Sequence, residues 1–204
     1  MVVPPHLSRH GNGTLDKDAL RKELRMRRRE HVAALPPSMQ ALVFHRPPAP
    51  LLELVPEGAR IGLYRAGPME APPASYARFF FERGHALSLP RFEHRAAPMH
   101  FAAFVDPFEE CDLEIGPFGL LQPAADAPVA TPEVLIVPLV GFTAEGQRLG
   151  QGGGHYDRWF AANPGARAIG LAWDCQLVGT LPTEAHDHPL DAVVTPTRIY
   201  GPFA

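Results

Sequence analysis

The sequence predicts a single α/β domain, in which one open sheet is flanked by helices on both faces. Apolar segments of strand length alternate with helical segments along most of the chain, and this alternation is typical of α/β folds. The 204 residues are enough for one well-packed domain and too few for two. A hydrophobic content of 46% and a charged content of 20% indicate an ordinary globular protein.

The first part of the chain is expected to be helical. Asp16 can cap a helix over residues 16–34, and Leu20 and Leu24 give this helix an apolar stripe. The two prolines at 36 and 37 end it, because proline cannot continue a helix. Shorter helices are expected at residues 38–44 and 51–55.

Strands and helices alternate in the rest of the chain. Each expected strand is a short apolar run, and the helices between them end at a glycine or before a proline. The strongest strand signal is the apolar run 133–140, which is typical of a buried strand, and residues 122–133 before it form a connection rich in proline and alanine. We expect strands at residues 60–64, 85–89, 99–105, 133–140, 168–173 and, as the last, 191–195, and further helices at 74–83 and 156–162.

Bulk properties exclude several classes of function. A formal net charge of −3 gives no case for nucleic-acid binding, and no apolar run approaches the roughly 20 residues that span a bilayer. Residues 1–15 lack the apolar core of a signal peptide and are expected to be a flexible tail before one domain at 16–204. Cys111 and Cys175 are far apart and form no metal-binding pair, so we expect a cytoplasmic protein, and a monomer.

A glycine-rich loop is the most informative segment. Four glycines, at 150, 152, 153 and 154, lie between Arg148 and Asp157. Glycine lets backbone N–H groups converge on one point, and a strand followed by such a loop and a helix start often makes an anion site. We therefore expect Arg148 to clamp a phosphate and Asp157 to bind a metal ion. An empty tight turn is the alternative, whereas the spacing fits neither a P-loop nor a dinucleotide fingerprint.

The segment Arg148-Leu-Gly-Gln-Gly-Gly-Gly-His-Tyr-Asp157 strongly resembles the signature of the 5-formyltetrahydrofolate cyclo-ligases, also called methenyltetrahydrofolate synthetases. Lys17-Asp-Ala-Leu-Arg21, Glu70 and residues 186–191 resemble further motifs of that family in the same order, so the resemblance covers residues 16 to 200. It implies an ATP-dependent closure of 5-formyltetrahydrofolate to 5,10-methenyltetrahydrofolate. It also implies the three-layer open sheet that this family shares with some sugar-phosphate isomerases and CoA transferases.

The resemblance also assigns ligands to residues. Arg148 would be the catalytic residue, because its planar fork can hold the transferring phosphoryl group as lysine cannot. Asp157 and Asp187 would hold Mg²⁺, which usually takes one or two carboxylates. The implied ATP-binding residues are Lys17, Arg21, Arg148, Leu149, Gly150, Gln151, Gly152, Gly153, Gly154, His155 and Tyr156. The implied folate-binding residues are Arg65, Glu70, Gln151, Gly152, Gly153, Gly154 and His155, with Tyr64, Phe118 and Tyr156 as candidate apolar walls.

Some residues depart from the family pattern. Thr143 replaces an aspartate and would remove a carboxylate near the nucleotide, and His155 replaces the first tyrosine of the signature. Two alternatives follow: a folate- or nucleotide-binding paralogue without catalysis, and a sugar-phosphate or CoA-ester enzyme of the same architecture that uses no ATP. The basic run 25–29 is interpreted as a solvated helix face, with attraction of polyanionic ligands as a second hypothesis.

Overall fold

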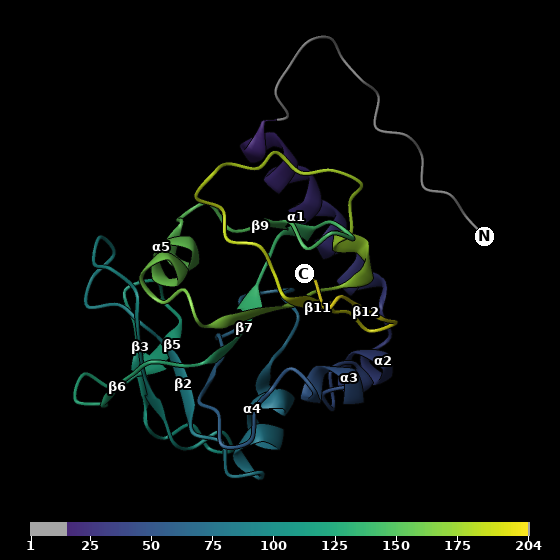
Figure 1. Cartoon of the computed structure of the whole chain (residues 1–204). Helices are drawn as coiled ribbons and strands as arrows, with labels where there is room; N and C mark the ends of the chain where they lie inside the picture. The colour runs from purple at the N-terminus through teal and green to yellow at the C-terminus, as the bar shows by residue number, and fades with distance from the viewer. Residues whose placement is uncertain (1–15, 204) are drawn as a thin grey trace.

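The computed structural model describes residues 16–203, and Figure 1 shows the arrangement of their helices and strands. The expected tail at residues 1–15 lies outside the described residues. Within the described part, no helix has the length and apolar character that crossing a membrane requires.

The first helix, α1, has the expected cap and length. It spans Lys17–Ala34, and the side chain of Asp16 accepts a hydrogen bond of 3.0 Å from the backbone N–H of Asp18. The two short helices that follow differ in position from the sequence prediction: α2 spans Pro37–Leu42 and α3 spans Ala49–Leu52. Phe44, expected inside a helix, has a φ of 57° and is buried, so the chain turns there to bring this ring into the core.

Eight strands form one mixed sheet in the order β12-β11-β10-β7-β1-β2-β3-β6 (Figure 1). The five strands from β11 to β2 run parallel, and β12, β3 and β6 pair antiparallel at the two edges. The bounds of these strands are β1 Ile61–Gly62, β2 Leu87–Arg91, β3 His100–Phe104, β6 Val129–Ala130, β7 Val134–Pro138, β10 Arg167–Leu171, β11 Ala192–Val194 and β12 Ile199–Tyr200.

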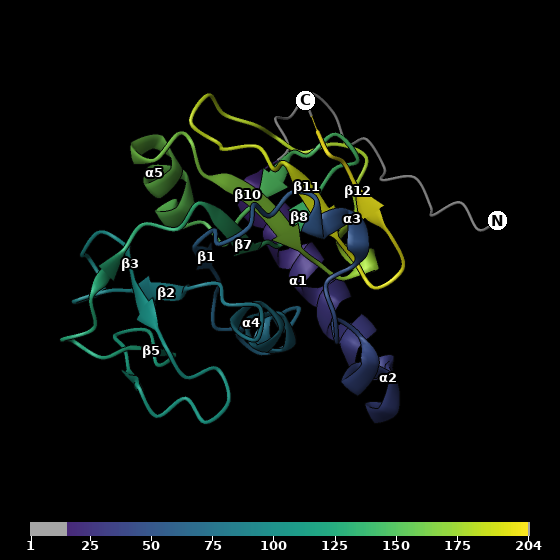
Figure 2. The same ribbon diagram turned by 60° about the horizontal axis from the view of Figure 1, so that its bottom comes forward.

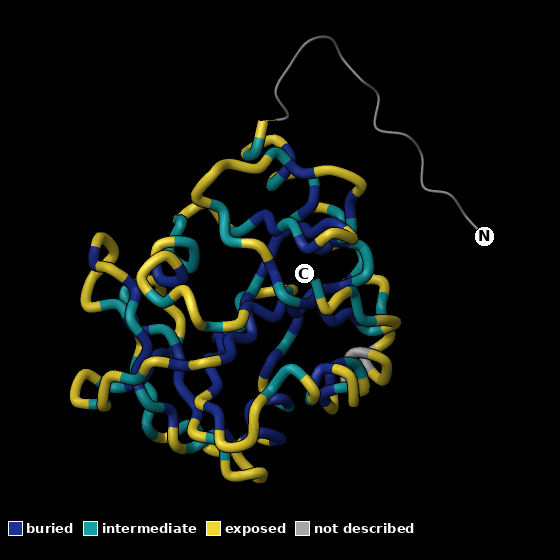
Figure 3. The backbone as a smooth tube through the Cα atoms, viewed as in Figure 1, coloured by how far each residue is buried: buried dark blue, intermediate teal, exposed yellow. Residues whose placement is uncertain are grey.

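Helices cover both faces of the sheet, as the sequence predicts. Val134 and Ile136 of β7 belong to one apolar cluster, which also contains residues of α1, α3 and α4 (Ala74–Phe81). Leu135 and Val137 of the same strand belong to a second cluster, which contains the buried rings of α5 (His155–Ala162). Figure 2 shows α4 and α5 on opposite sides of the sheet, and Figure 3 shows the buried backbone concentrated in the strands between them.

The sequence analysis did not predict several short strands. Two separate hairpins form, β4 (Leu113–Ile115) with β5 (Leu121–Pro123) and β8 (Gly141–Phe142) with β9 (Arg148–Leu149). The strand β6 lies inside the expected proline-rich connection, and β12 follows the strand that was expected to be the last. Strands of two or three residues are too short to show the alternating pattern from which a strand is recognised.

Candidate active site

A cavity of about 640 Å³ opens at the carboxyl ends of β1, β2 and β7. Tyr64 and Arg65 follow β1, Phe92 follows β2 and Pro138 ends β7, and all four line the cavity. Ligands of open α/β sheets bind beyond this edge of the strands. Every residue that the sequence analysis assigned to ATP, folate or Mg²⁺ lines this one cavity, although its ligand stays a prediction.

The glycine loop is held in an unusual backbone shape between β9 and α5. Gly152 has a φ of 106° and Gly154, the N-cap of α5, has a φ of 62°, a region that side chains other than glycine rarely adopt. Arg21 of α1 donates a hydrogen bond of 3.0 Å from Nε to the carbonyl of Gly150. Within residues 16–203, the backbone N–H groups of residues 150–154 donate no hydrogen bond, so they are available to an anion at the start of a helix.

Arg148 is the most deeply placed cation of the cavity. Its side chain is 4% exposed, and its guanidinium pairs with the carboxylate of Asp157 in the first turn of α5. The same carboxylate accepts a hydrogen bond of 3.3 Å from the backbone N–H of His188. A buried arginine is costly unless it is paired, so Asp157 holds Arg148 at the edge of the glycine loop.

Lys17 joins the start of α1 to the loop before β11. Its Nζ lies 2.7 Å from Oδ2 of Asp187 and 2.9 Å from Oε1 of Glu184. Burial works against the charge of Lys17, but the hydrogen bonds that its ammonium donates to these two carboxylates raise its pKa above the ordinary value. Burial likewise would raise the pKa of Asp187, yet the bond from Lys17 lowers it. Both groups therefore stay charged at neutral pH.

The two residues expected to bind Mg²⁺ are carboxylates that line the cavity. Asp157 and Asp187 both line the cavity, and Mg²⁺ uses one or two such carboxylates together with water and phosphate oxygens. In the described part of the chain, no group of three or more His, Cys, Asp or Glu residues is arranged around a common metal position. The imidazole of His188 stacks on the ring of Phe160, with ring centroids 4.1 Å apart.

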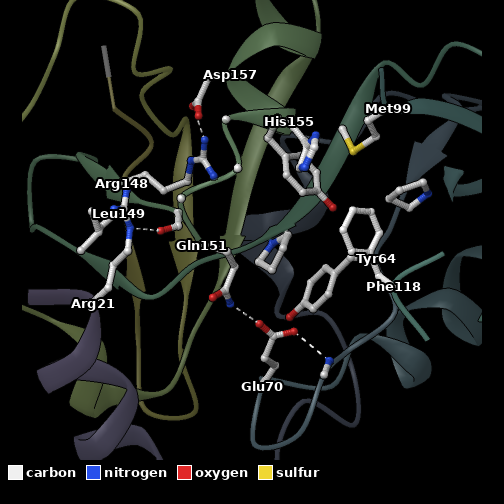
Figure 4. A pocket seen from close by; sticks show the side chains of 18 of the residues that line it. Arg21, Tyr64, Glu70, Met99, Phe118, Arg148, Leu149, Gln151, His155 and Asp157 are labelled. Atoms are coloured by element: carbon white, nitrogen blue, oxygen red, sulfur yellow. Dashed lines mark hydrogen bonds and ion pairs between the residues drawn. The ribbon is translucent and has the colours of Figure 1, made fainter. Parts of the chain in front are cut away.

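Glu70 lies opposite the glycine loop and contacts it directly. Its Oε2 accepts a hydrogen bond of 2.8 Å from the backbone N–H of Gly67, and its Oε1 accepts one from Nε2 of Gln151. Figure 4 shows Glu70 and Gln151 pointing toward one another across the cavity. Arg65, the other residue assigned to folate, pairs with Glu110 at the rim.

An aromatic cluster forms the wall nearest to the β4–β5 hairpin. The ring of Phe92 lies 5.0 Å from that of Phe118 and 4.9 Å from that of His155, and both pairs meet edge to face. Tyr64 and Met99 lie on the same side of the cavity (Figure 4). Phe92 and Met99 were not identified from the sequence. Phe92 directly follows β2, but the expected strand at residues 85–89 ends three residues before it.

The expectation for Thr143 is wrong. Thr143 does not line the cavity; it lies in the turn between β8 and β9 and is fully buried, at 0% exposure. Its hydroxyl accepts hydrogen bonds of 3.3 Å from the backbone N–H groups of Glu145 and Gln147. A hydroxyl at this position therefore stabilises a turn, and its replacement of an aspartate removes no carboxylate from the cavity.

The interpretation of residues 25–29 as a solvated face holds for Arg29 and fails for Arg28. Arg29 is exposed, whereas Arg28 is only 7% exposed and lies beneath Glu70. Arg25 also reaches the site, because its guanidinium donates hydrogen bonds to Gln151. The spacing from Lys17 through Arg21 and Arg25 to Arg28 follows the helical repeat, and this repeat was the signal for a site-facing stripe.

Known proteins resemble this chain in sequence and in fold. The sequence model of the 5-formyltetrahydrofolate cyclo-ligase family matches residues 14–196. The 5-formyltetrahydrofolate cyclo-ligase of Escherichia coli K12 is 40% identical over 103 residues, which are 48% of this chain and 57% of that protein. The protein of that name from Haemophilus influenzae is 36% identical over 97 residues, which are 45% of this chain and 52% of that protein. The chain thus spans about half the length of these curated relatives.

Two solved structures share the fold. The 5,10-methenyltetrahydrofolate synthetase of Aquifex aeolicus matches with a TM-score of 0.69 and 24% identity, over 91% of this chain and 92% of that one. The protein of that name from Mycoplasma pneumoniae matches with a TM-score of 0.60 and 19% identity, over 88% of this chain and 98% of that one. At these identities the likeness establishes the arrangement of helices and strands.

We predict that His155 titrates below the ordinary range of histidine. Burial, and after it the charge of Arg158, lower the pKa of its imidazole below 6.5. The unfolded chain therefore binds this proton first as the pH falls, and the free energy of unfolding decreases below the unfolded pKa. An NMR titration of the histidine ring protons, with His155→Gln to assign the signal, measures the midpoint. A midpoint at or above that of histidine in an unstructured peptide would contradict the prediction.

Proposed function

The chain belongs to the 5-formyltetrahydrofolate cyclo-ligase family, and we propose that it closes 5-formyltetrahydrofolate to 5,10-methenyltetrahydrofolate at the expense of ATP. The main support is one observation: Arg148 and the glycine loop, whose N–H groups at residues 150–154 donate no hydrogen bond within residues 16–203, line the same cavity as the Glu70 carboxylate. The cavity volume of about 640 Å³ is within the usual range for small-molecule sites.

The nucleotide half of the proposed site is built from positive groups. Lys17, Arg21 and Arg148 line the cavity together with the glycine loop, and this density of cations suits a triphosphate. A sugar phosphate with one phosphate group does not need three such cations around one loop. Mg²⁺, when bound, would be held by Asp157 and Asp187 and would neutralise phosphate charge.

The folate half offers a carboxylate and an apolar wall. The reduced pterin carries N–H groups, which a carboxylate such as Glu70 can accept. The rings of Phe92 and Phe118 and the imidazole of His155 would pack against the pterin and keep water away from the reacting atoms. Burial keeps His155 neutral at pH 7, so it adds no charge to this wall.

The proposed reaction has two steps. The formyl oxygen attacks the γ-phosphorus of ATP, the bond from that phosphorus to the β–γ bridging oxygen breaks, and ADP leaves. N10 of the folate then attacks the formyl carbon and loses its proton, and the former formyl oxygen departs as part of inorganic phosphate. Arg148 would hold the transferring phosphoryl oxygens with two parallel N–H donors, and the loop N–H groups would keep this phosphate in line with the formyl oxygen.

The cellular setting completes the proposal. Cys111 and Cys175 are free thiols, which suits a reducing compartment, and we propose a cytoplasmic monomer that works without nucleic acid or membrane.

The reaction itself is the first prediction. The protein mixed with MgATP and 5-formyltetrahydrofolate should produce the near-ultraviolet absorbance of the methenyl product, and omission of ATP should abolish it. Product formed without ATP would contradict the phosphorylation step. Tight folate binding without product would favour a folate-binding paralogue without catalysis. Turnover of a sugar phosphate or CoA ester would favour an enzyme of the same architecture that uses no ATP.

Arg148→Ala should lower turnover by roughly 10²-fold or more while changing folate affinity little, because the lost contact is with the transferring phosphoryl group. Arg148→Lys keeps the positive charge but loses the two parallel N–H donors of the guanidinium. Its turnover should lie between that of the wild type and that of Arg148→Ala. Stopped-flow turnover and the dissociation constant of 5-formyltetrahydrofolate separate the two effects. Equal losses in rate and in folate affinity would remove Arg148 from the phosphoryl-transfer step.

Asp157→Asn and Asp187→Asn should each raise the Mg²⁺ concentration needed for half-maximal activity, because each removes a carboxylate from the proposed metal site. Asp126→Asn is the matched control, since Asp126 is exposed and lies outside the cavity. A Mg²⁺ titration of turnover in the three variants tests this. An unchanged Mg²⁺ requirement in either site variant would exclude that residue from the metal site.

A further inference from the structure

Arg28 is a buried cation directly behind the proposed folate site. Its side chain is 9% exposed, and its NH1 lies 3.7 Å from Oε1 of Glu70 and 3.5 Å from the carbonyl oxygen of Leu139. Among the described residues, its Nε is buried without a hydrogen-bond partner, and Glu70 is the carboxylate within ion-pair distance. Arg28 does not itself line the cavity.

Glu70 is held at both of its oxygens. Oε1 faces Arg28 and accepts the hydrogen bond from Gln151, while Oε2 accepts the bond of 2.8 Å from the backbone N–H of Gly67. An ionised carboxylate offers about four acceptor positions. Because Oε1 is engaged by two side chains, the remaining acceptor capacity lies mainly on Oε2.

Gln151 is oriented by a second arginine of the same helix. Arg25 donates to the side-chain oxygen of Gln151 from NH2 at 2.8 Å and from Nε at 3.2 Å, and to its backbone oxygen from NH2 at 3.0 Å. The amide oxygen of Gln151 therefore faces Arg25, and its NH₂ group faces Glu70. Two arginines of α1 thus fix both partners of the contact between the glycine loop and Glu70.

Stability alone gives little reason for an arginine at position 28. Its ion pair with Glu70 is longer than a hydrogen bond, and one of its nitrogens is unpaired, so the gain from this pair is small against the cost of burying the charge. Well-packed apolar residues in place of a buried ion pair often leave stability equal or higher. A role in the site accounts for the charge better than a role in the core.

We propose that Arg28 is a positioning residue for folate, which sets the affinity for the substrate by fixing the orientation of Glu70. This inference rests on the proposed function, in which Glu70 accepts hydrogen bonds from the reduced pterin. Arg28 acts through Glu70 and makes no contact with either substrate, so its effect on the nucleotide is expected to be small.

The test compares Arg28→Met with Arg29→Met, the neighbouring arginine that is exposed. Isothermal titration of each variant with 5-formyltetrahydrofolate and, separately, with MgATP gives two dissociation constants. Arg28→Met should weaken folate binding roughly tenfold or more and change MgATP binding less than about twofold, because one displaced hydrogen-bonding group costs at least this much. Arg29→Met should leave both constants unchanged.

A double-mutant cycle separates positioning from general damage. In a Glu70→Gln background, Arg28→Met should cost little further folate affinity, because its effect is carried by the Glu70 carboxylate. Arg28→Lys, which keeps the charge, covers the case in which Arg28→Met does not fold, and it should restore part of the affinity. Circular dichroism of every variant verifies the fold.

The outcomes distinguish the inference from the function on which it rests. Wild-type protein that does not bind 5-formyltetrahydrofolate would overturn both. Normal wild-type binding together with equal constants for Arg28→Met and Arg29→Met would overturn the inference alone. Losses at Arg28 and Glu70 that simply add in the double variant, or equal losses for folate and MgATP, would show a structural role and also overturn it.

Discussion

The docking of α1 onto the β8–β9 hairpin is the constraint on which the candidate site depends. Leu20 and Leu24 of α1 pack with Val140 and Leu149 in one small apolar cluster. The helix approaches so closely that a Cβ atom at Gly141 would lie 2.6 Å from Cδ1 of Leu24, so a larger residue there would displace this leucine side chain. This contact sets the distance between the basic face of α1 and the glycine loop. Once it forms, the arginines that follow at helical spacing reach that loop or Glu70 beyond it.

The charges of the cavity are balanced in pairs. Arg148 pairs with Asp157 and Lys17 pairs with Asp187, while Arg28 lies against Glu70. An array of unpaired cations around one cavity would repel itself and be expensive to bury, so each cation has a carboxylate partner. Under the proposed function, a magnesium–nucleotide complex would bring both an anion for the arginine and lysine groups and a cation for the freed carboxylates.

Sequence patterns predict the parts of this protein that local chemistry determines. The cap at Asp16, the apolar stripe of α1, the buried strand β7 and the glycine loop all follow from neighbours in the chain. The helical repeat places Arg28 on the same face as Lys17 and Arg21, but it does not predict the contact with Glu70, which lies far away in the sequence. The same holds for Thr143, whose hydroxyl serves a hairpin of two-residue strands that carries no periodic signal.

The order of the strands explains why the two halves of the site meet. Glu70 lies in the connection after β1, and Gln151 lies in the connection after β7, beyond the β8–β9 hairpin. The strands β1 and β7 pair in parallel, with Ile61 opposite Val134. Parallel neighbours end at the same edge of the sheet, so the loops that follow them must lie side by side. A phosphoryl transfer between two bound substrates needs this adjacency, because it is fast only when the reacting atoms are held in contact. The hydrogen bond from Gln151 to Glu70 joins the loop proposed for the nucleotide to the residue proposed for folate, so under the proposed function the two substrates would meet near this contact.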